Sequence, residues 1–406
     1  MPRCEGVTTT HVWCLIAGLA SALTAGREVE AQDTLIVRAE QPALWGAAPT
    51  LVEELRIGSL DGSQYETFGR LTAAAVGPAG EMLVVDGQGP ALRLYDSTGR
   101  YRLQLGRPGQ GPGEYRQIMG VRFTREGRVA IWDPGNQRIT VYETDGGLFN
   151  SIRVESSLQG GNDPFQVDTA GNFYVRAMRS HEGAVITGYT WIKIGPGGGV
   201  LDSIPVPPAD TEGRPLVVLT PSGPRKPFTI ETTSALSPFG YQVTGRTDTY
   251  AIWRPLSDGR VLRIERPVRS VPVGREERQQ WEAILDFMQS VSRAGSAAFL
   301  PIPAEKPVFR ELWVDESGRI WVSRYVPANH VALSREELEE REGRPALEWI
   351  EPPVWDVWDP RGSFLGTLTL QRGAFPAAAR GSEVWVVEHG SFGESYFVRY
   401  RVNAGG

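Results

Sequence analysis

Two stretches of the chain carry the same pattern about 47 residues apart: residues 80–86 read Gly-Glu-Met-Leu-Val-Val-Asp, and residues 127–133 read Gly-Arg-Val-Ala-Ile-Trp-Asp. A tyrosine follows each aspartate, Tyr95 or Tyr142, and then come a Gly/Asp turn and a further short apolar run. An internal period of this length, with such turns between short β-rich runs, is typical of stacked four-stranded units. Residues 69–154 therefore predict two successive blades of a β-propeller.

The second strand of each repeat is apolar on consecutive residues, at Met82–Val85 and Val129–Trp132. A strand has this composition when both of its faces are covered, as when sheets pack face to face around an axis. Weaker copies of the same strand and turn rhythm occupy four later segments, at about 164–206, 228–265, 309–370 and 377–401.

The last unit ends without a fourth strand, while Leu51–Ile57 near the start has no unit of its own. If this early strand completes the last blade, the ring closes and no sheet edge is left naked. We therefore predict an all-β fold, a six-bladed β-propeller with an N-terminal strand that closes the last blade and a helical insertion between blades 4 and 5. Two packed β domains are the alternative.

Three insertions interrupt the β pattern, at 207–226, 271–306 and 326–350. By connectivity all three emerge on the same face of the ring. Within 274–293, apolar residues at helical spacing predict a helix whose stripe packs onto the β body, with a membrane or partner helix as the alternative; the stripe is Trp281, Ile284, Leu285, Met288 and Val291. Ser334-Arg-Glu-Glu337 predicts the capped start of a second helix.

The start of the chain has the form of a signal peptide, residues 1–31, with Arg3 followed by an apolar run at 12–23 and cleavage before Gln32. The apolar run is shorter than the roughly 20 residues that a membrane span needs. Cleavage would remove both cysteines, Cys4 and Cys14. We expect an exported protein, periplasmic or extracellular, with a linker at 32–50, a propeller domain at 51–406 and no transmembrane segment in the mature chain.

The net charge is −6, and no run of Lys or Arg is present. Both observations argue against a nucleic-acid partner. The sequence also has no Gly-x-Ser-x-Gly, His-Glu-x-x-His or P-loop motif. We expect a monomer.

Residues 132–142, Trp-Asp-Pro-Gly-Asn-Gln-Arg-Ile-Thr-Val-Tyr, resemble the NHL repeat, in which an aspartate precedes Asn-x-Arg-Ile/Val and an aromatic residue. The linker Gly109–Tyr115 is similar to the Gly-Pro-Gly-Glu-aromatic segment of bacterial NHL-like propellers. The first repeat departs from the pattern, with Gln88-Gly89-Pro90 at the place of the asparagine. The resemblance implies a six-bladed propeller of the bacterial exported type. Its relatives include binding platforms, calcium-dependent lactonases and a zinc-dependent amidating lyase, so the fold does not decide the function.

Carboxylates end the second strands of three neighbouring blades, at Asp86, Asp133 and Glu388. Three interpretations remain open: hydrogen bonds to nearby backbone or a pair with Arg138, a Ca²⁺ site helped by Asn136, or a catalytic acid and base. No cofactor is certain, and Ca²⁺ is the candidate.

Guanidinium groups end the second strands of blades 4 and 5, at Arg246 and Arg324, while Arg176 and Arg179 flank the corresponding Ala177 of blade 3. They predict either ion pairs with neighbouring carboxylates or a pocket for an anion. His330, in a loop of the same face, joins the ligand-binding candidates. It forms no compact zinc motif with the other histidines of the mature chain, His181 and His389.

We therefore expect a non-catalytic exported propeller that binds a small anionic ligand or an envelope protein through its loop-bearing face. The alternative is a metal-dependent hydrolase or lyase, lactonase-like or amidating-lyase-like. A third class is a purely structural module of a cell-envelope complex.

Overall fold

The structure is a computed structural model of the whole chain, and it describes residues 33–39, 42–155, 165–181, 185–207, 227–291, 301–339, 341–390 and 393–405. The predicted signal peptide and nearly all of the insertion at 207–226 lie outside these residues.

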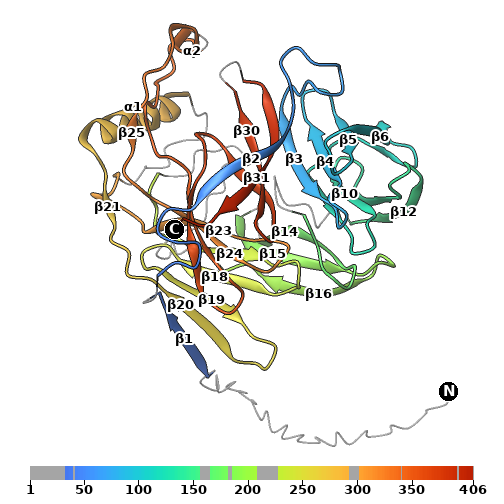
Figure 1. Cartoon of the computed structure of the whole chain (residues 1–406), viewed down its shortest axis with the longest axis horizontal. Coiled ribbons are helices and arrows are strands. Elements are labelled where there is room, and N and C mark those ends of the chain that lie inside the picture. The colour runs from blue at the N-terminus through green and yellow to red at the C-terminus, as the bar shows by residue number, and fades with distance from the viewer. Residues whose placement is uncertain are drawn as a thin grey trace, which may run out of the picture.

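Six antiparallel sheets follow one another around a ring, as the repeats predict (Figure 1). The first three blades are β3 (Leu71–Val76), β4 (Met82–Asp86), β5 (Ala91–Tyr95) and β6 (Tyr101–Leu105); β9 (Gly120–Phe123), β10 (Val129–Asp133), β11 (Arg138–Tyr142) and β12 (Leu148–Arg153); and β13 (Gln166–Val167), β14 (Phe173–His181), β15 (Val185–Ile194) and β16 (Val200–Pro205). Strand β14 runs past Ala177, so this residue does not end its strand as predicted.

The other three blades contain the insertions at 271–306 and 326–350 and the early strand β2 (Thr50–Ile57). They are β17 (Thr232–Leu236), β18 (Gln242–Arg246), β19 (Ala251–Pro255) and β20 (Val261–Glu265); β23 (Phe309–Val314), β24 (Ile320–Arg324), β27 (Val354–Trp358) and β28 (Phe364–Thr369); and β29 (Phe375–Arg380), β30 (Glu383–His389), β31 (Ser395–Asn403) and β2 (Thr50–Ile57).

Glycine permits the tight turn that joins the first two strands of a blade. Gly80 and Gly127 occupy the same place in the two clear repeats, and both have φ of 85°. Side chains with a Cβ rarely adopt this left-handed conformation, which is why the repeat begins with glycine.

Strand β2 closes the ring, which confirms the prediction for Leu51–Ile57. It pairs antiparallel with β31, with Leu51 opposite Val402 and Ile57 opposite Phe397. In Figure 1 the blue β2 runs beside the red β31, so the beginning and the end of the chain share one sheet.

The residues before β2 form a strap over two further blades, which the sequence did not predict. Strand β1 (Thr34–Arg38) adds to blade 4 as a fifth strand, parallel to β20. The amides of Leu44 and Trp45 then donate to the carbonyls of Phe364 and Leu365 on the outer strand of blade 5. The segment predicted as a linker therefore contacts blades 4, 5 and 6 in succession.

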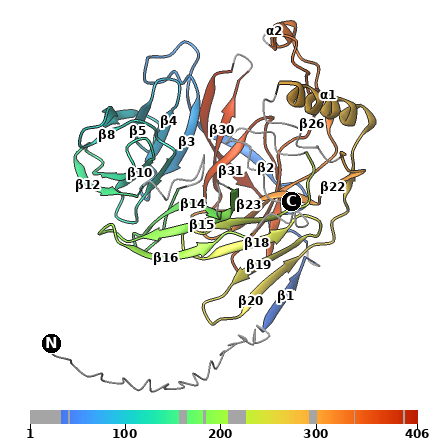
Figure 2. The ribbon, with the colours of Figure 1, turned by 180° about the vertical axis from the view of Figure 1, so that it is seen from behind.

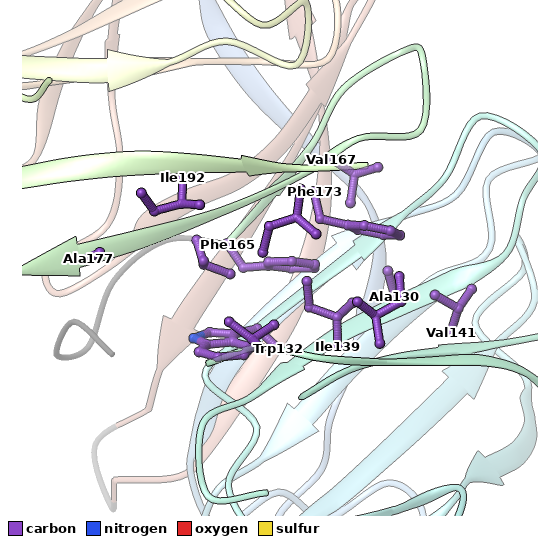
Figure 3. Close-up of a cluster of buried hydrophobic side chains, with 13 residues drawn as sticks. Ala130, Trp132, Ile139, Val141, Phe165, Val167, Phe173, Ala177 and Ile192 are labelled. Carbon is purple, nitrogen blue, oxygen red and sulfur yellow. The ribbon is translucent and has the colours of Figure 1, made fainter. Parts of the chain in front are cut away.

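Hydrophobic clusters fill the spaces between neighbouring blades. Ala130 and Trp132 of β10 pack towards blade 3, where they meet Phe165 and Phe173 (Figure 3). Val129 and Ile131, on the other face of β10, belong to the cluster shared with blade 1. This two-sided burial explains why the strand is apolar on consecutive residues.

Two of the predicted insertions lie together at one end of the molecule (Figures 1 and 2), and we call them the cap. The first contains β21 (Val271–Pro272), α1 (Arg275–Val291) and β22 (Glu305–Lys306). The second contains β25 (Asn329–His330), α2 (Arg335–Glu339) and β26 (Trp349–Ile350). A further pair, β7 (Arg107–Pro108) and β8 (Glu114–Tyr115), lies in the linker between blades 1 and 2.

Helix α1 packs onto the β body through Leu285, which is buried with Phe228 and Ile302, and through the partly buried Trp281. The predicted stripe is wrong at its end, because Val291 in the last turn is 60% exposed. Among the described residues, no helix is long and apolar enough to cross a membrane.

Candidate functional site

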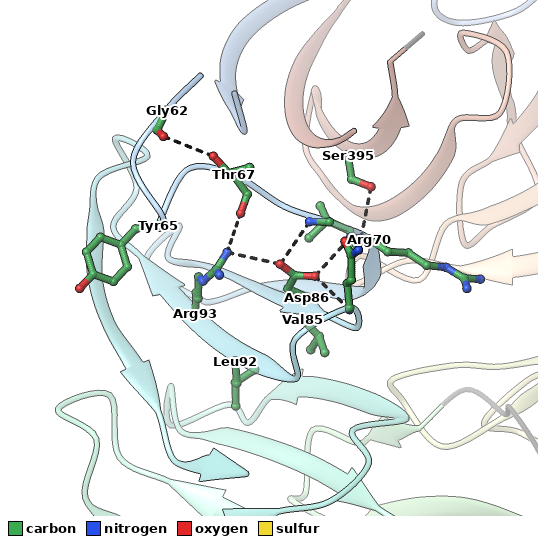
Figure 4. A network of polar contacts seen from close by, with 12 residues as sticks. Gly62, Tyr65, Thr67, Arg70, Val85, Asp86, Leu92, Arg93 and Ser395 are labelled. Carbon is green, nitrogen blue, oxygen red and sulfur yellow. Dashed lines mark hydrogen bonds and ion pairs between the residues drawn. The ribbon is translucent and has the colours of Figure 1, made fainter. Parts of the chain in front are cut away.

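Asp86 and Asp133 do the same structural work in successive blades. Asp133 accepts hydrogen bonds from the backbone amides of Arg116 and Gln117, each at 3.0 Å. Asp86 accepts the corresponding amides of Gly69 and Arg70 at 3.3 and 3.2 Å (Figure 4). Each carboxylate thereby fixes the linker that enters its own blade, which is the first of the three interpretations drawn from the sequence.

The NHL-like residues of blade 2 also hold a linker. Asn136 donates its side-chain amide to Asp133 at 2.7 Å and to the Gly109 carbonyl at 2.9 Å. Arg138 donates to the Gly111 carbonyl at 2.7 Å. Instead of the predicted pairing with each other, Asp133 accepts hydrogen bonds from the chain between blades 1 and 2, and Arg138 donates to a carbonyl of that same linker.

Glu388 is buried with partners of its own. Its carboxylate accepts a hydrogen bond from Tyr400 at 2.6 Å and one from Arg56 at 3.1 Å. Within the described ranges, no three His, Cys, Asp or Glu side chains are placed to hold a metal ion. The Ca²⁺ site of Asp86, Asp133 and Glu388 therefore stays a prediction, and all three carboxylates already accept hydrogen bonds from the protein.

The two strand-end arginines are paired with aspartates. Arg246 Nε lies 2.7 Å from Asp248 Oδ2, and Arg324 Nε lies 3.8 Å from Asp356 Oδ2. Arg176 stacks its guanidinium 4.0 Å from the centroid of the Tyr189 ring. The side chains of Arg179 and His181 lie outside the described part of the structure. Of the two arrangements that the sequence predicted for Arg246 and Arg324, the structure shows guanidinium groups that lie beside neighbouring carboxylates.

His330 lies in a cleft between α1 and the second insertion. The cleft encloses about 470 Å³. One wall comes from α1 and the other from residues around β25 and β26, and the lining is Glu276, Gln279, Gln280, Ala283, His330, Pro345, Ala346 and Trp349. The His330 and Trp349 rings meet edge to face at 5.5 Å, and His330 Nε2 lies 3.8 Å from Glu348.

Hydrogen bonds fix the two walls of this cleft against each other. Gln280 of α1 accepts hydrogen bonds from the backbone amides of Glu348 and Trp349, at 2.7 and 3.3 Å. Within the second insertion, Arg341 donates to the Pro345 carbonyl at 2.9 Å, which fixes the shape of that wall. The cleft is therefore held open by the protein's own contacts.

A buried charge cluster ties the cap to the blade below. Lys306, fully buried, donates to Glu277 of α1 at 2.6 Å and to Glu351 at 2.9 Å. Glu351 also meets Arg310 at 2.5 Å, and the Lys306 ammonium lies 5.0 Å from the Phe228 ring centroid. Taking these charges out of water is compensated by close pairing and added hydrogen bonds.

Sequence reasoning identified His330 in this region but missed Lys306, Glu277, Glu351 and Trp349. Lys306 is 29 residues from Glu277 and 45 residues from Glu351 in the chain, and no sequence pattern relates the three positions to one another. The available signal was the three insertions predicted to emerge on one face, which indicated where long connections gather but not which residues make contact there.

Comparison with known proteins supports the architecture. Residues 78–191 match the model of the family DUF5128, described as a 6-bladed beta-propeller. Together with the six sheets of the structure, this match shows that the chain is a six-bladed β-propeller. No curated protein matches the chain in sequence.

Several solved structures are similar to the chain at low identity. A DUF4221 family member from Bacteroides vulgatus is 10% identical with a TM-score of 0.49, over 88% of this chain and 99% of that one. A Bacteroides fragilis protein named as a candidate exported protein is 10% identical, with a TM-score of 0.45 over 91% and 99%. A Xanthomonas campestris gluconolactonase is 12% identical, with a TM-score of 0.38 over 82% and 86%. These values carry no argument about activity or ligand.

Proposed function

We propose that this propeller is an exported ligand-binding module and that its binding site is the cap cleft. The observation that supports the proposal is the fixed relation of the two walls, which Gln280 joins by two hydrogen bonds to the backbone of the second insertion. Binding sites are commonly preformed concave pockets in which a few polar groups orient the ligand. Long insertions on a rigid scaffold are where such sites occur.

The lining favours a ligand with a cationic or aromatic group. No Lys or Arg is among the lining residues, whereas Glu276 is, and Glu348 lies beside His330. Trp349 offers an indole ring, and an indole attracts a cation over its face by roughly 0.5–2 kcal/mol. Ala283 and Pro345 supply apolar surface. The expectation of an anionic ligand therefore does not suit this cleft.

A thermal-shift screen of small amines, aromatic cations and matched anions tests the proposal, and the second readout is any change in tryptophan fluorescence on binding that Trp349→Ala abolishes. A binding amine should lose its effect in Trp349→Ala. Phe149→Ala is the control, because Phe149 is 52% exposed on blade 2, outside the cap. A compound that stabilises Trp349→Ala as strongly as the parent would place the binding site elsewhere.

A further inference from the structure

A second hollow lies beside the strap, on blade 4. It encloses about 360 Å³ between the end of β1, the end of β20 and the turn that joins β18 to β19. Strand β1 lies along β20 there (Figure 1). Its lining includes Arg38, Thr249, Arg263, Glu265, Arg266 and Pro267, and it shares no residue with the cap cleft.

Positive charge exceeds negative charge in this hollow. Glu265 carries two guanidiniums, with Arg38 Nε at 3.0 Å from one carboxylate oxygen and Arg263 Nη2 at 2.7 Å from the other. One carboxylate is therefore shared between two cations from different strands.

Arg266 does not relieve this excess. It pairs with Asp356, a fully buried residue of blade 5 that also faces Arg324 at 3.8 Å. Tyr250 and Thr367 donate hydrogen bonds to the same carboxylate, at 3.0 and 2.7 Å. Glu265 and Asp356 thus each face two guanidinium groups, in two separate clusters.

Two buried guanidinium donors that line the hollow, Arg263 Nε and Arg266 Nη1, make no hydrogen bond to the described part of the chain, although Arg266 Nη1 lies beside the Asp356 carboxylate. A buried donor without a partner destabilises the folded protein, and an incoming acceptor would relieve that cost. Guanidinium groups match the geometry of carboxylate and phosphate oxygens.

We propose that this hollow binds an oxyanion group, a carboxylate or a phosphate, between Arg38, Arg263 and Arg266. The negative charge of this group offsets the positive charge of the arginines that Glu265 and Asp356 do not neutralise. Because Arg38 belongs to β1 and Arg263 to β20, the bound anion also joins the strap to blade 4. The site is independent of the cap cleft and of the function proposed for it.

Inorganic phosphate and succinate are the probes, titrated at constant ionic strength with chloride as the balancing ion. At least one probe should raise the melting temperature and slow amide hydrogen exchange in residues 34–38. The double variant Arg38→Gln/Arg263→Gln should weaken its binding at least tenfold. Arg260→Gln with Arg269→Gln is the matched control for charge, and it should bind as the parent does.

Equal binding by the parent, the double variant and the control would overturn the proposal, as would the absence of any response to both probes. Circular dichroism of the double variant checks that it folds, and exchange protection of β1 in the parent is a readout that needs no variant. Trp349→Ala should keep the response to the oxyanion, so the two proposed sites can fail separately.

Discussion

Lys306 donates to Glu277 across 2.6 Å in a site without solvent exposure, and this contact joins the cap helix to the strand that leads into blade 5. The cap is therefore anchored to the propeller through buried contacts and not only through the chain connections. Since Glu351 follows directly after β26, the same ammonium also holds the second insertion. The position of both cleft walls depends on one buried cation.

Lys306→Met should destabilise the protein by about 3–5 kcal/mol, because removal of one partner leaves buried carboxylates without compensation. Chemical denaturation monitored by fluorescence measures the change. The exposed pair of Arg335 and Glu339 is the control, and Arg335→Ala should leave the unfolding midpoint unchanged. A Lys306→Met protein as stable as the parent would show that the cluster contributes nothing to the cap.

Asp133→Ala should cost about 1–3 kcal/mol for each backbone donor left unsatisfied, at Arg116 and Gln117. Urea unfolding checks this, with the exposed Arg372→Ala as a neutral comparison. Asp86→Ala should behave in the same way, because its bonds to Gly69 and Arg70 are equivalent. A strong effect in one blade and none in the other would contradict the shared role.

Metal removal should leave the melting temperature unchanged. The carboxylates of Asp86, Asp133 and Glu388 accept hydrogen bonds from the protein, and these donors compete with an ion for the carboxylate oxygens. Differential scanning calorimetry with EDTA and with added Ca²⁺, together with elemental analysis, tests this. A stoichiometric metal, or a rise in melting temperature with Ca²⁺, would favour the metal-dependent enzyme interpretation.

Deleting residues 50–57 should cause aggregation or a large loss in melting temperature, because β31 would become a naked sheet edge. Deleting residues 33–38 is the matched control. Blade 4 keeps four strands without β1, whose side chains are mostly exposed. Light scattering and thermal melts should separate the two variants, and equal behaviour would refute ring closure as the main role of β2.

Glu316 should make stability depend on pH. Burial raises its pKa above the ordinary 4.5, opposed by a hydrogen bond from the Ala379 amide. Between 4.5 and the raised value, the folded protein holds a proton that the unfolded chain has lost, so stability falls as pH rises through that window. Glu316→Gln should flatten this slope, with a remainder from Asp315, whose pKa burial also raises. Denaturation midpoints at several pH values measure it, and an unchanged slope would contradict the assignment.

The repeat pattern predicted the blades because turn glycines and two-sided apolar strands are local features with a fixed period, as at Gly80 and Gly127. Ring closure was also predictable, since the surplus strand at 51–57 and the missing strand at the end complement each other. The parallel pairing of β1 with β20 could not be predicted. An edge strand whose side chains are mostly exposed has no hydrophobic pattern that indicates which strand it will pair with. Lys306 was missed for a related reason: its burial depends on partners from two separate insertions.

The strand pairing of blade 6 also determines the order in which the protein can fold. Strand β2 precedes blades 1 to 5 in the chain, while its partner β31 follows them. Strand β2 therefore has no partner until the five intervening blades have been synthesised, and contacts between such distant segments form slowly. Until β31 is available, the unpaired edge of β2 can form non-native contacts with other strands. Any chaperone that assists this protein should be needed most in the interval between the emergence of β2 and the arrival of β31.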